Sequence, residues 1–212
     1  MIQAINTFYN GFYFRSRLEA RWAVYFDLIQ EQYEYEPQGL IFQDKYKYLP
    51  DFYLPKRKLL CEIKSRSAMQ VDGIDLLSLN ENANRYRAIA KDFQKQGMLY
   101  VIFMGSPYDY IFNNAKWWYD QRTTSPGFDE FGDYTFIYNY EVIDNAIRGI
   151  LNDTFKDQAI LAAKIRFEHD AKPEKIIQEF QREQKRRRIT SELRELDEFF
   201  KARRERMGSG KQ

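Results

Sequence analysis

The sequence predicts an α/β protein in which helices cover a central β-sheet. Residues 16–30 carry apolar side chains at the three- and four-residue spacing of an amphipathic helix. Residues 48–64 contain two short apolar runs separated by a polar break, which is the pattern of a β-hairpin. Residues 98–104 are apolar throughout, as expected of a strand that is buried on both faces.

The predicted core elements follow one another in the order helix–strand–strand–strand–helix–strand. They are a helix at 16–30, a strand within 33–42, the hairpin strands 48–54 and 59–64, a helix at 82–95 and the strand 98–104. Asn10-Gly11 predicts a turn before the first helix, and Ser16 is placed to cap that helix. Further along the chain, a strand is expected at 136–140, and helices at 141–150 and 153–169.

The 212 residues are sufficient for one well-buried domain with an appendage. We assign the domain to residues 1–172 and a charged helical tail to residues 173–212. The segment 174–212 contains 12 Lys and Arg against 8 Asp and Glu, a net charge of +4, so the rest of the chain carries −2 of the total of +2. The main body is therefore not a generally basic, nucleic-acid-binding surface.

The tail combines a basic run at 185–188 with an apolar stripe at four- and three-residue steps, made by Ile189, Leu193, Leu196 and Phe200. This stripe is only about one and a half heptads long, which is short for a coiled coil. Three roles are open for the tail: it retains DNA, it binds a second copy of the chain or an assembly partner, or it is a solvated charged helix.

The sequence contains no segment that suggests a membrane or export. No run approaches about 20 apolar residues, and the N-terminus has no basic-then-apolar signal pattern. We therefore expect a cytoplasmic protein with no membrane partner.

Cysteine and histidine are nearly absent, which narrows the possible chemistry. Cys61 is the only cysteine and His169 the only histidine, so disulfides, cysteine zinc clusters and histidine-based catalysis are not expected. Cys61 alternates with Glu62 along its strand and is expected to face the packed side. Carboxylates and lysine remain to carry any chemistry.

The hairpin at 48–64 brings charged side chains together. If Leu54 faces Leu59 in the antiparallel pair, then Asp51 faces Glu62, and strand alternation places Lys64 on the same face as Glu62. Opposed side chains have Cβ atoms about 5 Å apart, so two carboxylates there need a cation between them or a shared proton. A divalent metal with a neighbouring lysine explains this arrangement. The alternative is a surface hairpin with an ordinary salt bridge.

The same hairpin carries a short motif, in which Pro50-Asp51 and Glu62-Ile63-Lys64 are separated by ten residues. This motif resembles the signature of the PD-(D/E)XK nuclease superfamily, and residues 15–22 (RSRLEARW) are similar to the first helix of many small phage and mobile-element members. The resemblance covers roughly residues 8–170 and leaves the tail outside it. It implies a restriction-endonuclease-like αβββαβ core with a central mixed sheet flanked by helices, plus a C-terminal helical extension.

The resemblance also implies an activity, namely Mg²⁺- or Mn²⁺-dependent hydrolysis of DNA phosphodiester bonds by an endonuclease of phage or mobile-element origin. A phage-encoded enzyme would act in the cytoplasm of a bacterial host cell. Asp51, Glu62 and the backbone carbonyl of Ile63 would hold the metal. Lys64 would orient or deprotonate the attacking water, or stabilise the developing charge, with a pKa depressed by the neighbouring cation. The alternative is a catalytically idle nuclease fold that acts as a DNA-binding or phage assembly accessory.

Glu19 is a further candidate for the metal site. It lies at the inner edge of the apolar face of the first helix, where an unpaired carboxylate is costly. In several branches of the superfamily an acidic residue on this helix helps to hold the metal, which makes Glu19 a third ligand or a contributor from the surrounding shell. The alternative is an ion pair with Arg15 or Arg21.

Overall fold

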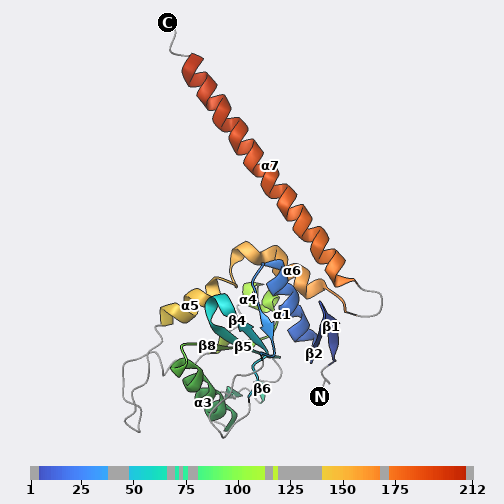
Figure 1. Ribbon diagram of the computed structural model, residues 1–212, viewed down its shortest axis with the longest axis vertical. Helices are drawn as coiled ribbons and strands as arrows, with labels where there is room; N and C mark the ends of the chain where they lie inside the picture. Colours follow the sequence, from blue (N-terminus) through green and yellow to red (C-terminus); the bar gives the residue numbers. More distant parts are fainter. Residues whose placement is uncertain are drawn as a thin grey trace. The chain divides into compact units, whose positions relative to one another are not determined.

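A computed structural model describes residues 5–37, 48–65, 70–71, 74–75, 81–112, 117–118, 140–167 and 172–208 (Figure 1). The chain divides into two units, Met1–Phe167 and Glu168–Gln212. The first unit contains the sheet and the candidate site. The division expected from the sequence, with a domain at residues 1–172 and a helical tail at residues 173–212, stays a prediction.

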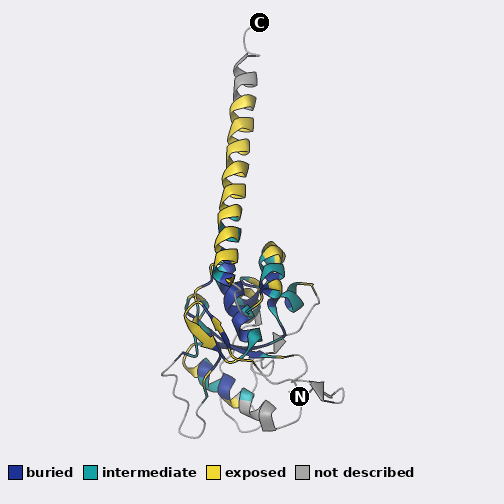
Figure 2. Ribbon diagram, turned by 90° about the vertical axis from the view of Figure 1, so that its right-hand side faces the viewer, coloured by how far each residue is buried: buried dark blue, intermediate teal, exposed yellow. Residues whose placement is uncertain are grey.

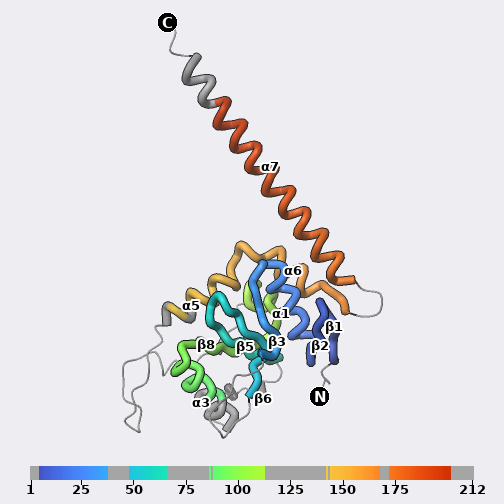
Figure 3. Tube along the Cα trace, in the orientation of Figure 1, coloured from blue at the N-terminus to red at the C-terminus, as the bar shows by residue number. Residues whose placement is uncertain are grey.

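A five-stranded mixed sheet lies at the centre of the first unit (Figure 3). Its strands in spatial order are β3 (Glu34–Tyr35), β4 (Phe52–Leu54), β5 (Leu59–Lys64), β8 (Leu99–Met104) and β9 (Trp117–Trp118). β5 and β8 run parallel, and the other neighbouring pairs are antiparallel. All residues of β5 and β8 except the last of each are buried. β8 is apolar throughout, as expected of a strand that is covered on both faces, whereas β5 also buries the carboxylate of Glu62.

Helices cover both faces of this sheet. The helices described in this unit are α1 (Arg17–Leu28), α3 (Glu81–Lys95), α4 (Pro107–Phe112), α5 (Tyr140–Arg148) and α6 (Lys156–Lys164). On one face Phe93 of α3 stacks on Tyr100 of β8, with ring centroids 5.9 Å apart. On the other face Trp22 of α1 stacks on Phe103, with centroids 4.6 Å apart. The predicted α/β class, with a mixed sheet flanked by helices, is confirmed.

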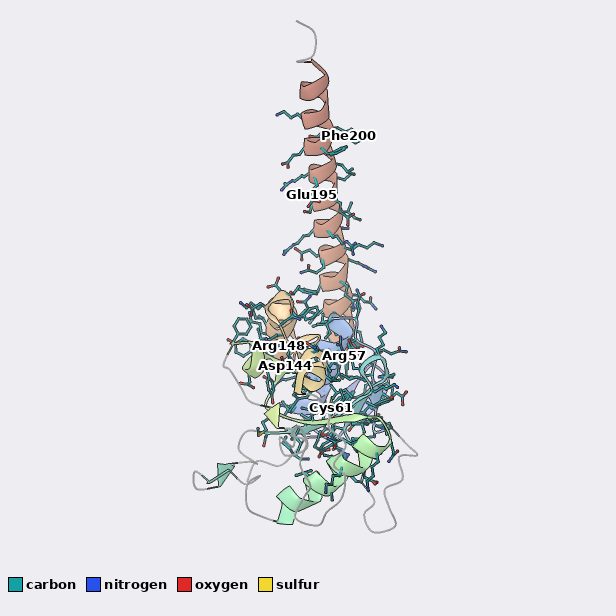
Figure 4. All side chains as sticks on the ribbon, turned by 90° about the vertical axis from the view of Figure 1, so that its left-hand side faces the viewer. Arg57, Cys61, Asp144, Arg148, Glu195 and Phe200 are labelled. Atoms are coloured by element: carbon teal, nitrogen blue, oxygen red, sulfur yellow. The ribbon has the colours of Figure 1, made fainter. Side chains whose placement is uncertain are left out.

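The register of the β4–β5 hairpin agrees with the prediction, because Leu54 pairs with Leu59. The polar break forms a short 3-10 turn, η1 (Pro55–Arg57), which Lys58 closes in the left-handed region at φ 49°. Cys61 is fully buried, as expected for the side of β5 opposite to Glu62 (Figure 4).

Arg57 in this turn joins the hairpin to the end of α5 (Figure 4). Its guanidinium pairs with Glu31 at 2.9 Å and donates hydrogen bonds to the carbonyls of Ala146 at 3.3 Å and Gly149 at 3.2 Å. These carbonyls lie at the C-terminal end of α5, where helical partners are missing. Residue 149 must be small for this contact, because a Cβ there would lie 2.1 Å from Nη1 of Arg57.

Two segments differ from the elements that the sequence predicts. The start of the chain forms a hairpin, β1 (Thr7–Tyr9) and β2 (Phe12–Phe14), where only a turn is predicted. Asn10 and Gly11 connect its strands with φ values of 48° and 85°, as in tight two-residue hairpin turns. The helix expected at 153–169 is shorter. It consists of the 3-10 turn η4 (Asp153–Phe155) followed by α6, which ends at Lys164, and Ile165 is extended.

Other predictions fall partly outside the described residues. These are residues 38–42 of the first predicted strand, residues 136–139 of the later strand, and His169. Tyr140 is described, and it begins α5 instead of ending a strand.

A second small hairpin, β6 (Gln70–Val71) with β7 (Ile74–Asp75), follows β5.

The second unit contains one long helix, α7 (Pro173–Gly208), of 36 residues. The helical tail is therefore present as expected. Ile189, Leu193, Leu196 and Phe200 are 46% to 61% exposed, so the apolar stripe lies mostly in solvent (Figure 2). None of the helices in the described ranges is both long and apolar enough to cross a membrane.

Candidate functional site

The β4–β5 hairpin places Asp51 and Glu62 next to each other. Asp51 directly precedes β4, and the observed register continued by one residue sets it opposite Glu62. Both residues are buried, each with 5% of its surface exposed. Oδ2 of Asp51 accepts a hydrogen bond from the backbone N–H of Ile63 at 2.6 Å, which ties the two strands together at this point. The structure thus brings together the two carboxylates that the sequence pairs.

Each oxygen of the Glu62 carboxylate has a donor. Nζ of Lys64 donates to Oε1, and the hydroxyl of Tyr48 donates to Oε2. The hydroxyl of Tyr48 also lies 2.6 Å from the hydroxyl of Tyr100, a residue that is 3% exposed. Lys64 and Glu62 therefore meet on one face of β5, and two tyrosines support the carboxylate from the face that α3 covers.

The surroundings of Asp51 disfavour its charged form. Burial and then the charge of Glu62 raise the pKa of Asp51 to about 8. The hydrogen bond from Ile63 lowers this pKa, the charge of Glu19 raises it, and Lys64 lowers it. A divalent cation bound between these two buried carboxylates would offset their repulsion and stabilise the ionised form of both.

Lys64 keeps its positive charge in this setting. Burial lowers the pKa of Lys64, but the charge and hydrogen bond of Glu62 more than offset the effect of burial, so the pKa is raised. The depressed pKa expected from the sequence depends on a cation held at the carboxylates. The Glu62 carboxylate by itself shifts the pKa of Lys64 in the opposite direction.

Glu19 lies buried in the first turn of α1, with its carboxylate in a helix cap. The carboxylate accepts hydrogen bonds from Ser16 Oγ at 2.7 Å, from the Tyr35 hydroxyl at 2.7 Å and from the backbone N–H of Arg15 at 3.2 Å. Ser16 Oγ in turn accepts from the backbone N–H of Glu19 at 3.2 Å. The charge of Glu19 still contributes to the raised pKa of Asp51. Its role as a metal ligand stays a prediction.

Arg15 places an exposed cation beside the buried carboxylates. Its Nε lies 2.5 Å from Glu36 and an Nη lies 3.6 Å from Oδ1 of Asp51. The side chain is 59% exposed. The sequence suggests Arg15 as an ion-pair partner of Glu19, whereas the structure directs its guanidinium toward Glu36 and Asp51.

The donor set has the chemistry of a hard divalent cation site but is not closed around one. Among the described residues, no three His, Cys, Asp or Glu side chains are grouped closely enough to hold a metal ion. Asp51 and Glu62 supply two carboxylates, which are ligands that Mg²⁺ and Mn²⁺ prefer. Oδ2 of Asp51 is hydrogen-bonded, and Oδ1 has only the longer contact with Arg15. A bound ion would share Glu62 with Lys64 and take further ligands from carbonyls, water or substrate.

Tyr48 and Tyr100 contact the site, although the sequence does not identify them. In the parallel pair of β5 and β8, Tyr100 lies opposite Leu60 and Ile102 lies opposite Glu62. Tyr100 is thus brought to the face of Glu62 only by this register. Identifying Tyr100 from the sequence would have required knowing that β5 pairs with β8, and local sequence patterns do not reveal such a long-range pairing.

Comparisons with known proteins do not assign this site. No protein-family model matches the chain, and neither curated proteins nor solved structures provide a significant match.

If Asp51 and Glu62 hold a metal ion, replacing Tyr100 by phenylalanine is expected to weaken its binding. The change removes the hydroxyl that supports Tyr48, so the Glu62 carboxylate is held less firmly. Loss of a group bonded directly to a metal ligand typically costs roughly 10- to 100-fold in metal affinity, and a smaller loss is expected for Tyr100, which acts through Tyr48. Titration calorimetry with Mn²⁺ measures this, and Tyr13→Phe at an exposed position serves as the control. Equal Mn²⁺ affinities for Tyr100→Phe and the unmodified protein would show that the Tyr100 hydroxyl does not help Tyr48 to orient Glu62.

Asp51→Asn is expected to stabilise the metal-free protein at neutral and alkaline pH. Asparagine still accepts the Ile63 hydrogen bond but brings no buried charge. The pKa of Asp51 is 3.8 ordinarily and about 8 in the fold, so the unfolded chain loses its proton first and stability falls as pH rises between these values. The gain in Tm for the variant should be absent below about pH 4 and level off above about pH 8. Thermal unfolding in EDTA measures this gain, and a pH-independent difference would contradict the raised pKa.

Proposed function

We propose that this chain is a metal-dependent deoxyribonuclease of the PD-(D/E)XK type. The observation that carries the proposal is the buried pair of Asp51 and Glu62 with Lys64 beside it, all held by one hairpin. Such a pair destabilises the fold by itself, and buried groups with shifted pKa values are typical of functional sites. The order α1, β3, β4, β5, α3, β8 is also the order of the αβββαβ core that the motif implies.

In this proposal Asp51 and Glu62 hold Mg²⁺ or Mn²⁺. The resemblance to the superfamily adds the backbone carbonyl of Ile63 as a further ligand. When bound, such an ion supplies positive charge at the scissile phosphate and lowers the pKa of a coordinated water. Asp51 is then ionised, because a cation beside it offsets the repulsion from Glu62. Glu19 is the candidate for a third carboxylate, and it would exchange a capping bond to Ser16 for this role.

Lys64 is the cationic group of the proposed site. Because its pKa is raised, it carries a positive charge at neutral pH and can orient the attacking water or stabilise charge that develops on the phosphate. Acting as a general base would require its pKa to fall once Glu62 is shared with an ion. We propose DNA and not RNA as the substrate only because of the resemblance to the superfamily.

Purified protein incubated with supercoiled plasmid, linear duplex and branched DNA tests the proposal. We expect phosphodiester cleavage with Mg²⁺ or Mn²⁺ and none with EDTA. Nicking or linearisation of the plasmid would identify an endonuclease, whereas loss of linear DNA alone would identify an exonuclease. Intact substrates under all of these conditions would reject a nuclease function.

The exposed apolar stripe of α7 favours a second candidate function. This stripe, which includes Leu193 at 61% exposure and Leu196 at 51%, suits a partner that covers it. An inactive nuclease fold that uses α7 to join an assembly would bind DNA or a protein partner without cutting. The same cleavage assay separates this candidate from the enzyme.

Ending the chain after His169 is expected to reveal what α7 does. If the basic run at 185–188 grips phosphates, truncation weakens DNA binding and flattens its salt dependence, because fewer counterions are released. If the stripe mediates self-association, the truncated protein forms a smaller particle while DNA binding per subunit stays the same. Light scattering and salt-dependent fluorescence anisotropy measure the two effects. If neither changes, α7 is a solvated charged helix.

A further inference from the structure

The outer face of the β1–β2 hairpin is aromatic and exposed. Phe8 and Tyr13 face each other across the two strands, with ring centroids 4.8 Å apart. Phe8 is 53% exposed and Tyr13 is 76% exposed, so these rings contribute little to the core. Packing of the fold therefore does not explain why two large rings stand at adjacent exposed positions.

The inner face of the hairpin is fixed to the rest of the first unit, as the position of the two strands beside α1 shows (Figure 3). Tyr9 is 2% exposed, and its hydroxyl donates to Asp27 of α1 at 2.6 Å. Phe14 is fully buried, and its ring lies 4.4 Å from that of Tyr35 on β3. The exposed rings are therefore presented on an anchored ribbon.

The hairpin leads directly into the candidate site. Arg15 follows β2 and stands two residues after Tyr13. Its exposed guanidinium lies 3.6 Å from Oδ1 of Asp51. Phe8, Tyr13 and Arg15 thus lie on one short segment of the chain, and Arg15 connects this segment to the buried carboxylate of Asp51.

We propose that this aromatic face binds unpaired nucleotides of the substrate beside the scissile phosphate. Bases stack on Phe8 and Tyr13, because the face of an aromatic ring accepts every base, and Arg15 contacts a phosphate. The inference rests on the proposed nuclease function and narrows its substrate to single-stranded, frayed or branched DNA. Two rings offer far less than the ~800 Å² per partner of a stable protein interface, which disfavours a second copy of the chain as the occupant.

The test measures binding of a fluorescent 20-nucleotide single strand and of the matching duplex, with Ca²⁺ in place of Mg²⁺ to prevent cutting. The test variant is the double substitution Phe8→Ser with Tyr13→Ser. A second variant, Phe8→Tyr with Tyr13→Phe, keeps both rings. Phe112→Ser on α4, where the ring is 38% exposed, is the matched control for the loss of a surface aromatic residue. Thermal unfolding of every variant accompanies the binding measurements.

We expect the double serine variant to bind the single strand at least about tenfold more weakly, as the loss of base stacking predicts, with a much smaller change for the duplex. The ring-keeping variant and Phe112→Ser should bind as the unmodified protein does. A bromodeoxyuridine strand should cross-link to Phe8 or Tyr13 on irradiation.

Equal single-strand affinity of the serine variant and the unmodified protein would overturn the inference. A serine variant that changes from dimer to monomer with unchanged DNA affinity would also overturn it, because a second copy would then be the occupant. The proposed function fails separately, since absence of cleavage by the unmodified protein rejects the nuclease whatever the binding data show.

Discussion

Asp51→Asn and Lys64→Ala are each expected to abolish Mg²⁺-dependent cleavage while the protein stays folded. Asp51→Asn keeps the hydrogen bond from Ile63 but removes a metal-binding charge. Lys64→Ala removes the cation that pairs with Glu62. Loss of one group that stabilises developing charge typically slows an enzyme by about 10²- to 10³-fold, and loss of a metal ligand should cost at least as much.

Plasmid cleavage rates at saturating Mg²⁺ measure this effect. Asp153→Asn is a matched control, because the Asp153 side chain is 84% exposed in η4 and should leave the rate unchanged. Circular dichroism of each variant verifies the fold. Cutting at the unmodified rate by either Asp51→Asn or Lys64→Ala would remove that residue from the active site.

Trp22→Ala is expected to destabilise the first unit severely. Trp22 is fully buried, its ring stacks on Phe103, and Nε1 donates to the carbonyl of Gly105 at 2.9 Å. Truncating a buried tryptophan costs about 3–5 kcal/mol, and leaving a buried carbonyl without a donor adds about 1–3 kcal/mol. Domains of this size are typically stable by only about 5–15 kcal/mol, so much of the variant should be unfolded at physiological temperature.

Urea unfolding monitored by circular dichroism measures this loss. Trp22→Phe should lose less, because it keeps a ring against Phe103 and gives up mainly the hydrogen bond to Gly105. Tyr13→Ala, at a 76% exposed position, should change stability by less than about 0.5 kcal/mol. Similar unfolding midpoints for Trp22→Ala and Tyr13→Ala would contradict the packing described for α1.

Much of the site was predictable because it is local. Asp51 and Glu62 lie in one hairpin, so a turn of four residues and strand alternation are enough to place them opposite each other. The capping of α1 is local as well, since Ser16 and Glu19 have the spacing of a capping box. The hydrogen bonds between Ser16 and Glu19 could therefore have been anticipated from the sequence, whereas the one from Tyr35 on β3 could not.

The remaining features depend on contacts between distant segments. Tyr100 reaches Glu62 only through the parallel pairing of β5 with β8. Trp22 and Gly105 are 83 residues apart in the sequence. Gly105 adopts φ 104°, and a Cβ there would lie 2.9 Å from the carboxylate of Asp109, so its need for glycine appears only in three dimensions. Periodicity predicts which face of an element is buried but not which element covers it.

The proposed function requires Asp51 and Glu62 to form one divalent metal site. X-ray diffraction from crystals soaked in Mn²⁺, recorded near the manganese absorption edge, tests it most directly. We predict an anomalous peak within about 2.5 Å of a carboxylate oxygen of both Asp51 and Glu62, which is coordination distance. Mn²⁺ at other positions only, with the hydrogen bonds from Ile63 to Asp51 and from Lys64 to Glu62 retained, would show that these two carboxylates do not form a metal site.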